Sequence, residues 1–159
     1  MSHSTLISKP SFAENRGFTL IEVLVAMVIL AVGLLGIAAL YVDSLRASRT
    51  ALLRTQAIAV ASDLADRIRA NRDACTATSC AYTGTGTAHA ACETTAGCSP
   101  DQLAANDIEQ WTATAGELLP GFVGTVEFAA GPPNQYVITV TWVEPDAGGE
   151  SSYALTVYT

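Results

Sequence analysis

The sequence predicts an α+β fold in which a long N-terminal α-helix packs on a small antiparallel β-sheet of about three to four strands. The first observation is residues 23–42, an uncharged run long enough to cross the roughly 30 Å hydrocarbon core of a bilayer at about 1.5 Å per residue. The second is an amphipathic stretch over 43–72 without Pro or Gly. The third is a C-terminal series of segments with alternating apolar and polar residues.

The first half of the helix, residues 18–42, is predicted to span the membrane. It carries one charge, Glu22, close to its start. An unpaired carboxylate in this position costs a few kcal/mol, so Glu22 is a candidate functional residue that needs a partner. An alternative is that Glu22 reaches the membrane interface as an ordinary acid at a helix end.

The remaining chain is organised as one further unit. The amphipathic half of the helix, 43–72, is followed by a globular region, 73–159, and should cover the apolar face of the sheet. Within this region we expect a loop over 73–101, a short helix over 101–119 and a β-sheet over 122–159. The expected strands are 123–129, 136–144 and 152–159.

The loop contains all four cysteines of the chain, Cys75, Cys80, Cys92 and Cys98. An even count after a membrane helix, in an oxidising compartment, predicts two disulfides, for which three connectivities exist. The pairs Cys75 with Cys80 and Cys92 with Cys98 are favoured because each closes a short loop. A zinc site that uses these cysteines and His89 is the alternative, although the CxxC spacing typical of zinc sites does not occur.

The charges are distributed unevenly. Every arginine after residue 17 lies in the stretch 46–72, and the ten charged residues after Arg72 are all acidic. A nucleic-acid surface needs clustered basic residues, so no nucleic-acid partner is expected. Recognisable catalytic or cofactor motifs are missing, which predicts a protein that is not an enzyme and has no cofactor or metal. The acids of the last hairpin could hold calcium or form a solvated turn: Glu144, Asp146 and Glu150.

The N-terminal residues carry a resemblance to a known class. GFTLIEVLVA after a short basic leader resembles the type III signal of type IV pilins. The resemblance implies that residues 1–17 are a prepilin leader, that prepilin peptidase cuts between Gly17 and Phe18, and that Phe18 is N-methylated. It also implies that Glu22 directs assembly: in a bundle of helices the Phe18 amine of a neighbouring subunit would stabilise Glu22, and a subunit out of register would leave both charges unpaired.

Later segments are similar to the PilV family, the minor pilins also called type IV pilus modification proteins. The similarity rests on the following segments: VLVAMVILAVGLLGIAAL, ASDLADRIRANRDAC, IEQW, LPG and YVITVTW. It implies a type IV pilin-like fold and a low-abundance subunit in a minor-pilin complex that primes pilus assembly at the filament tip, with roles in twitching motility and adhesion.

The implied partners are prepilin peptidase, the other minor pilins, the major pilin, inner-membrane lipid before assembly and, as a further candidate, a tip adhesin. The implied location is the inner membrane, crossed once, with the C-terminal region in the periplasm, and after assembly the pilus at the cell surface. Two alternatives remain open at the level of sequence. One is a minor pseudopilin of a type II secretion system, and the other is a membrane-anchored periplasmic protein that never polymerises.

Overall fold

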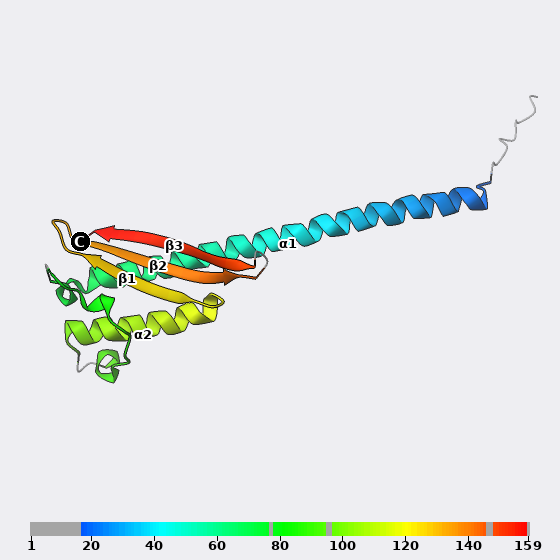
Figure 1. Cartoon of the computed structure of the whole chain (residues 1–159). Coiled ribbons are helices and arrows are strands. Elements are labelled where there is room, and N and C mark those ends of the chain that lie inside the picture. The colour runs from blue at the N-terminus through cyan, green and yellow to red at the C-terminus, as the bar shows by residue number, and fades with distance from the viewer. Residues whose placement is uncertain (1–16, 77, 95–96, 146–147, 159) are drawn as a thin grey trace, which may run out of the picture. The chain divides into compact units, whose positions relative to one another are not determined.

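The computed structural model describes residues 17–76, 78–94, 97–145 and 148–158. Its main elements are two helices, α1 (Leu20–Ala70) and α2 (Pro100–Leu118), and three strands, β1 (Val123–Ala129), β2 (Gln135–Glu144) and β3 (Gly149–Tyr158) (Figure 1). Between the helices, the described residues form short 3-10 helices at Arg72–Ala74, Ala81–Thr83 and Ala90–Glu93. The chain divides into two compact units, Met1–Asp43 and Ser44–Thr159.

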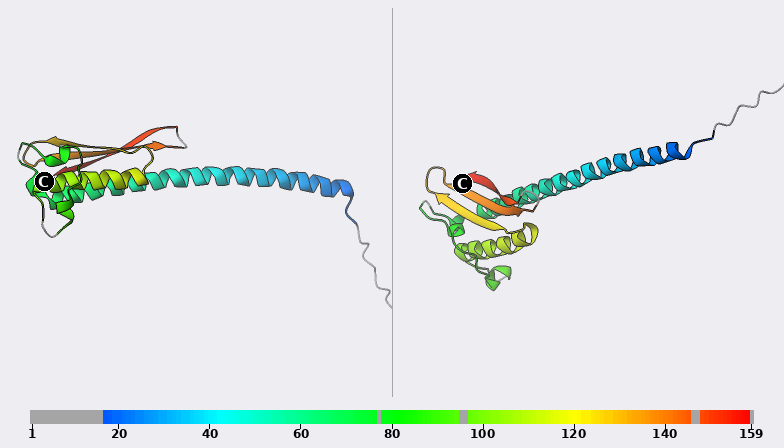
Figure 2. Two further views of the ribbon diagram at one scale, coloured as in Figure 1. Left: turned by 90° about the horizontal axis from the view of Figure 1, so that it is seen from below. Right: turned by 45° about the vertical axis from the view of Figure 1, so that its right-hand side comes forward.

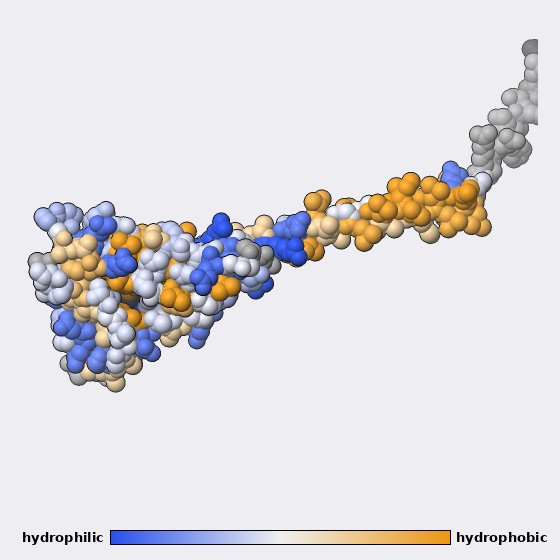
Figure 3. Space-filling view, in the orientation of Figure 1, coloured by the Kyte–Doolittle hydropathy of each residue, from blue (hydrophilic) through white to orange (hydrophobic). Residues whose placement is uncertain are grey.

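The first unit contains the beginning of α1, whose side chains are exposed along the whole segment 17–43. Nearly all of them are apolar, and Figure 3 shows hydrophobic surface over most of this segment. By length and composition α1 is able to cross a membrane, with a mean hydropathy of 3.0 in its most apolar 18-residue window. An apolar surface of this extent needs lipid or protein around it.

In the second unit, the later part of α1 buries one stripe of side chains. These residues recur at steps of three and four, so they share one face of the helix: Leu53, Ala57, Val60, Ala61, Leu64, Ala65 and Ile68. Several are alanines, which allow the strands and α2 to approach the helix closely.

The sheet has the order β1-β2-β3, and both pairings are antiparallel. The central strand β2 alternates, and its side chains directed at the helices are fully or almost fully buried: Tyr136, Ile138, Val140 and Trp142. These residues belong to the same core as the apolar stripe of α1. Figure 2 shows that α1 and α2 cover the same face of the sheet.

Helix α2 begins at a capping box. Ser99 accepts a hydrogen bond from the backbone N–H of Gln102, whose side chain in turn accepts from the backbone N–H of Ser99. Pro100 occupies the first helical position, where its missing N–H has no cost. Midway along the helix, buried Trp111 donates a hydrogen bond from Nε1 to the backbone oxygen of Val60, 2.8 Å away. This bond fixes α2 against α1.

The predicted fold class is confirmed: a long N-terminal helix packs on a three-stranded antiparallel sheet. The short helix lies one residue earlier than the expected 101–119, at Pro100–Leu118. The third strand begins at Gly149 rather than at residue 152, because the β2–β3 ladder extends to the pair of Glu144 with Gly149. The expected leader, apart from Gly17, lies outside the described residues.

Candidate functional site

The residues expected to be processed lie in the first unit, immediately before α1. Gly17 and Phe18 precede α1, and Phe18 is 83% exposed. Glu22 lies in the first turn of the helix, where its backbone N–H donates to the backbone oxygen of Thr19 at 3.1 Å. Phe18 and Glu22 line one open surface groove together with apolar residues of the next two turns, so they share one side of the helix. An acid in the first turn also interacts favourably with the helix dipole.

All four cysteines are bonded in the structure. Cys75 pairs with Cys80, and Cys92 pairs with Cys98, which are the two short-loop pairs that the spacing favours. The zinc alternative therefore has no thiolate available in the described chain. His89 makes a different contact, since its backbone N–H donates to Oδ1 of Asn106 at 2.8 Å.

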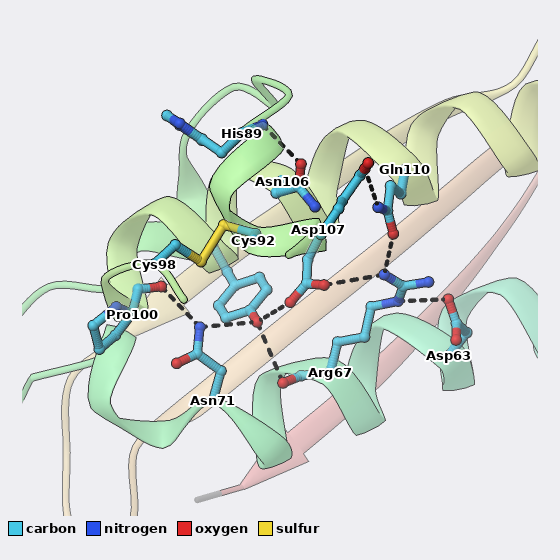
Figure 4. Close-up of polar contacts among 12 residues, drawn as sticks. Asp63, Arg67, Asn71, His89, Cys92, Cys98, Pro100, Asn106, Asp107 and Gln110 are labelled. Atoms are coloured by element: carbon cyan, nitrogen blue, oxygen red, sulfur yellow. Dashed lines mark hydrogen bonds and ion pairs between the residues drawn. A yellow bond between two sulfur atoms is a disulfide. The ribbon is translucent and has the colours of Figure 1, made fainter. Parts of the chain in front are cut away.

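A polar cluster joins α1, the cysteine-containing loop and α2 (Figure 4). Arg67 of α1 donates from Nη1 to Asp107 Oδ1 at 3.0 Å and from Nε to Asp63 Oδ2 at 3.0 Å. The hydroxyl of Tyr82, in the loop, donates to Asp107 Oδ2 at 2.6 Å. Asn71 donates to the Tyr82 oxygen at 3.3 Å and to the backbone oxygen of Pro100 at 2.8 Å. The contacts among Arg67, Asn71, Tyr82 and Asp107 hold the loop against both helices.

The cluster shifts the ionisation of two of its members. Burial raises the pKa of Tyr82, and the hydrogen bond to Asp107 raises it further. For Arg67, burial lowers the pKa, but the hydrogen bonds and charges of Asp107 and Asp63 outweigh it, so the pKa lies above its ordinary value. At neutral pH the cluster therefore contains a neutral phenol and a guanidinium cation around an acidic side chain.

The raised pKa of Tyr82 predicts a loss of stability in base. A raised pKa means that the folded state favours the neutral phenol. The stability that the Tyr82 phenol contributes is fully present below pH 10, and it decreases as the pH rises toward the folded-state pKa. We expect the stability difference between the wild type and Tyr82→Phe to change by about 1 kcal/mol per pH unit above pH 10. Urea unfolding at pH 8.0 and 11.0 measures it. A difference independent of pH would contradict the assignment.

Among the acids of the last hairpin, Glu144 differs from both sequence interpretations. Glu144 is buried, and its carboxylate pairs with Arg54 Nε of α1 at 3.2 Å, so it is neither in a solvated turn nor free for calcium. Glu150 is exposed, and Asp146 lies outside the described residues. Within the described part of the chain, no group of three or more His, Cys, Asp or Glu is arranged to hold a metal. Arg54 and Glu144 instead connect α1 to the end of β2.

The cluster around Asp107 was missed by sequence reasoning, although one signal was present. Residues 104, 108, 111 and 115 are the buried apolar face of α2, and Asp107 lies on that same face. A carboxylate on an apolar face needs a buried partner. The partners, Arg67 and Tyr82, come from distant parts of the chain, and their identity required the structure.

Comparison with protein families places two matches end to end on this chain. Residues 13–38 match the family model described as Prokaryotic N-terminal methylation motif. Residues 39–109 match the one described as Type IV pilin Tt1218. A search of curated proteins and a search of solved structures each found no match. The first match contains Gly17, Phe18 and Glu22, and the second contains the four cysteines and the polar cluster.

Proposed function

We propose that this protein is a minor pilin of the type IV pilus, related to the PilV family, that joins a complex which primes filament assembly at the tip. A prepilin methylation motif followed directly by a segment similar to type IV pilins supports a pilin role. The finer assignment as a minor, priming subunit rests on the resemblance of the sequence segments quoted above, including YVITVTW in β2.

One observation carries the proposal: a helix surface that is apolar and exposed over residues 18–42, interrupted by a single carboxylate. A soluble protein would bury such a surface, and a simple anchor would not need Glu22. Cleavage after Gly17 places a new amine on Phe18, four residues before Glu22 and on the same side of the helix. In a filament core, that amine on one subunit neutralises Glu22 on its neighbour.

The same features support the proposed location. The apolar helix and the methylation motif fit a single-pass, membrane-anchored pilin. We place the second unit in the periplasm before assembly, because its two disulfides form in an oxidising compartment. After assembly the subunit is at the cell surface as part of the pilus. Pilins are structural subunits, and the proposed partners are prepilin peptidase, the other minor pilins and the major pilin, with a tip adhesin as a further candidate.

Mass spectrometry of the N-terminal peptide tests the proposal. The peptide is isolated in parallel from sheared surface filaments and from the inner membrane. We expect a chain that starts with N-methylated Phe18 in both fractions. The same peptide confined to the membrane would favour a type II secretion pseudopilin, and an intact Gly17–Phe18 bond would identify an anchored protein that does not polymerise.

A variant at Gly17 tests the cleavage site itself. A Cβ atom at Gly17 would meet no other atom within 4 Å, so Gly17→Leu leaves the described fold undisturbed. We expect this variant to retain its leader, to stay in the membrane and to be missing from filaments, because the larger side chain obstructs the peptidase next to the scissile bond.

A further inference from the structure

Strand β3 forms one edge of the sheet. In the order β1-β2-β3, one side of β3 pairs with β2, and its other side pairs with no strand in the part of the chain that the structure describes (Figure 1). Edge strands usually carry charges, prolines or bulges that prevent pairing with another chain. Residues 151–158 contain no charge and no proline, and their register with β2 is unbroken. This edge is therefore open to a further strand.

The hydrogen bonds of β2 show which backbone groups of β3 are free. Val143 donates its N–H to the backbone oxygen of Pro120 at 2.8 Å, and Pro120 comes shortly before β1, so this N–H points to the β1 side. Successive strand residues direct their backbone groups to alternate sides, so Trp142 directs its own at β3, where Ser151 is its partner. The backbone groups that point away from β2 then belong to three exposed residues of β3: Ser152, Ala154 and Thr156.

A groove lies beside this edge, between β3 and α1. It has a volume of about 300 Å3, and its apolar walls include Ile58 of α1, Trp142 of β2 and Tyr153 of β3. Ile58 is 46% exposed, although it is apolar. The charged residue of the lining, Arg54, already pairs with Glu144 at 3.2 Å. An uncharged, apolar side chain is therefore favoured in the groove.

The edge and the groove together fit an extended peptide. Ser151 and Tyr153 direct their partly buried side chains toward the helices, so residues opposite them in an added strand direct theirs to the same side. In this mode of recognition, backbone hydrogen bonds to the edge provide affinity, and pockets for alternate side chains provide specificity. A helix cannot supply those bonds, because its backbone groups are already paired with each other.

We propose that the β3 edge binds an extended segment of a different protein, which adds as an antiparallel fourth strand and places an apolar side chain in the groove. The antiparallel direction continues the two existing pairings and gives the more stable ladder. Two copies of this chain that paired antiparallel through β3 would run in opposite directions, whereas subunits of one membrane or filament run in the same direction. The choice of a different protein over a second copy rests in this way on the proposed function; the chemistry of the edge does not.

Fluorescence anisotropy with the full chain in detergent micelles tests the edge. The probe is an acetylated hexapeptide of alternating threonine and valine, with a fluorescein-labelled lysine at its C-terminus. With the valines directed at the groove, the threonine N–H groups point at β3 and the valine N–H groups point away. N-methylation of the threonines should therefore weaken binding at least tenfold, whereas N-methylation of the valines should not. No binding of the unmodified peptide, or an equal effect of the two modifications, overturns the proposal.

Variants of the chain test the same edge from the other side. Ala154→Pro removes an outward N–H and obstructs the added strand, and proline is tolerated on an edge whose N–H faces solvent. It should bind the peptide at least tenfold more weakly, whereas Ala154→Ser should bind it like the wild type. Ile58→Ala should weaken binding about threefold or more. Leu52→Ala is its matched control, since it removes an exposed apolar side chain of α1 outside the groove. Unchanged binding by Ala154→Pro contradicts the proposed edge.

Analytical ultracentrifugation of the full chain in micelles tests the occupant. Self-association should be the same in the wild type and in Ala154→Pro. Self-association that Ala154→Pro abolishes would overturn the different protein as occupant in favour of a second copy. Neither readout depends on processing at Phe18, so failure here is distinguishable from failure of the pilin proposal.

Discussion

Replacing Glu22 with alanine is expected to remove the protein from filaments, with recovery in the sheared fraction falling at least tenfold. The residue stands alone as a charge in an apolar helix segment, 18–42. Under the proposed function it enters a bundle of apolar helices, where its carboxylate is stabilised only by the Phe18 amine of a neighbour. Loss of one partner of a buried ion pair costs about 3–5 kcal/mol, because the other charge remains unpaired.

The measurement compares the protein in sheared filaments with the total in the membrane. Glu22→Gln separates charge from size and is expected to fail like alanine. Glu117→Ala is the control, because it removes an exposed acid of α2 and should assemble normally. Leader cleavage should continue in all three variants. Normal incorporation of Glu22→Ala would show that the acid has no part in assembly.

Replacing Asp107 with alanine is expected to lower the free energy of unfolding by about 3 kcal/mol. Its side chain is 13% exposed and accepts hydrogen bonds from both Arg67 and Tyr82. Without the Asp107 carboxylate, Arg67 loses the less exposed of its two carboxylate partners. The buried phenol of Tyr82 loses its shortest hydrogen bond. Urea unfolding of the full chain in micelles, followed by Trp fluorescence, measures the change, since Trp111 lies one turn further along α2 and is buried.

Asp63→Ala is the matched control for this variant. Asp63 also accepts from Arg67 at 3.0 Å, but its side chain is 53% exposed and the pair lies within one helix. Pairs of this kind contribute about 0.5 kcal/mol or less. Equal losses for the two variants would show that the cluster around Asp107 contributes no more than a surface pair. Asp107 and Asp63 both pair with Arg67. A double-mutant cycle of each variant with Arg67→Ala therefore measures the coupling energy of each ion pair separately.

The parts of the structure that could be predicted are those with a local periodic pattern. The apolar run 18–42, the stripe from Leu53 to Ile68 and the alternation in β2 each follow from helix or strand geometry. The disulfide pairs could also be favoured from loop length alone. The sequence predicted no more than a loop over 73–101, yet Tyr82 in this loop is 1% exposed. Its anchor is Asp107, and no local rule pairs two residues 25 positions apart.

In the last hairpin, too, the sequence did not predict the partner of a buried side chain. Glu144 lies close to Pro145 and two glycines, so the sequence indicated a polar turn. The inward direction of Glu144 follows from the alternation that also buries Trp142, and its ion pair with Arg54 spans 90 positions. The pattern of β2 determines which way the carboxylate points, whereas its partner depends on how α1 packs against the sheet.

The order of the strands also bears on how quickly the protein can fold. Because β1, β2 and β3 pair in the order in which they are synthesised, their contacts have low contact order, and each disulfide closes across a separation of only 5 or 6 residues. Local contacts form with little loss of chain entropy and give fast folding. The contacts of these hairpins with α1 span much longer sequence separations, because α1 precedes the strands in the chain. Under the proposed function the chain is anchored by its N-terminus, so α1, the helix that the sheet packs on, is synthesised before the strands.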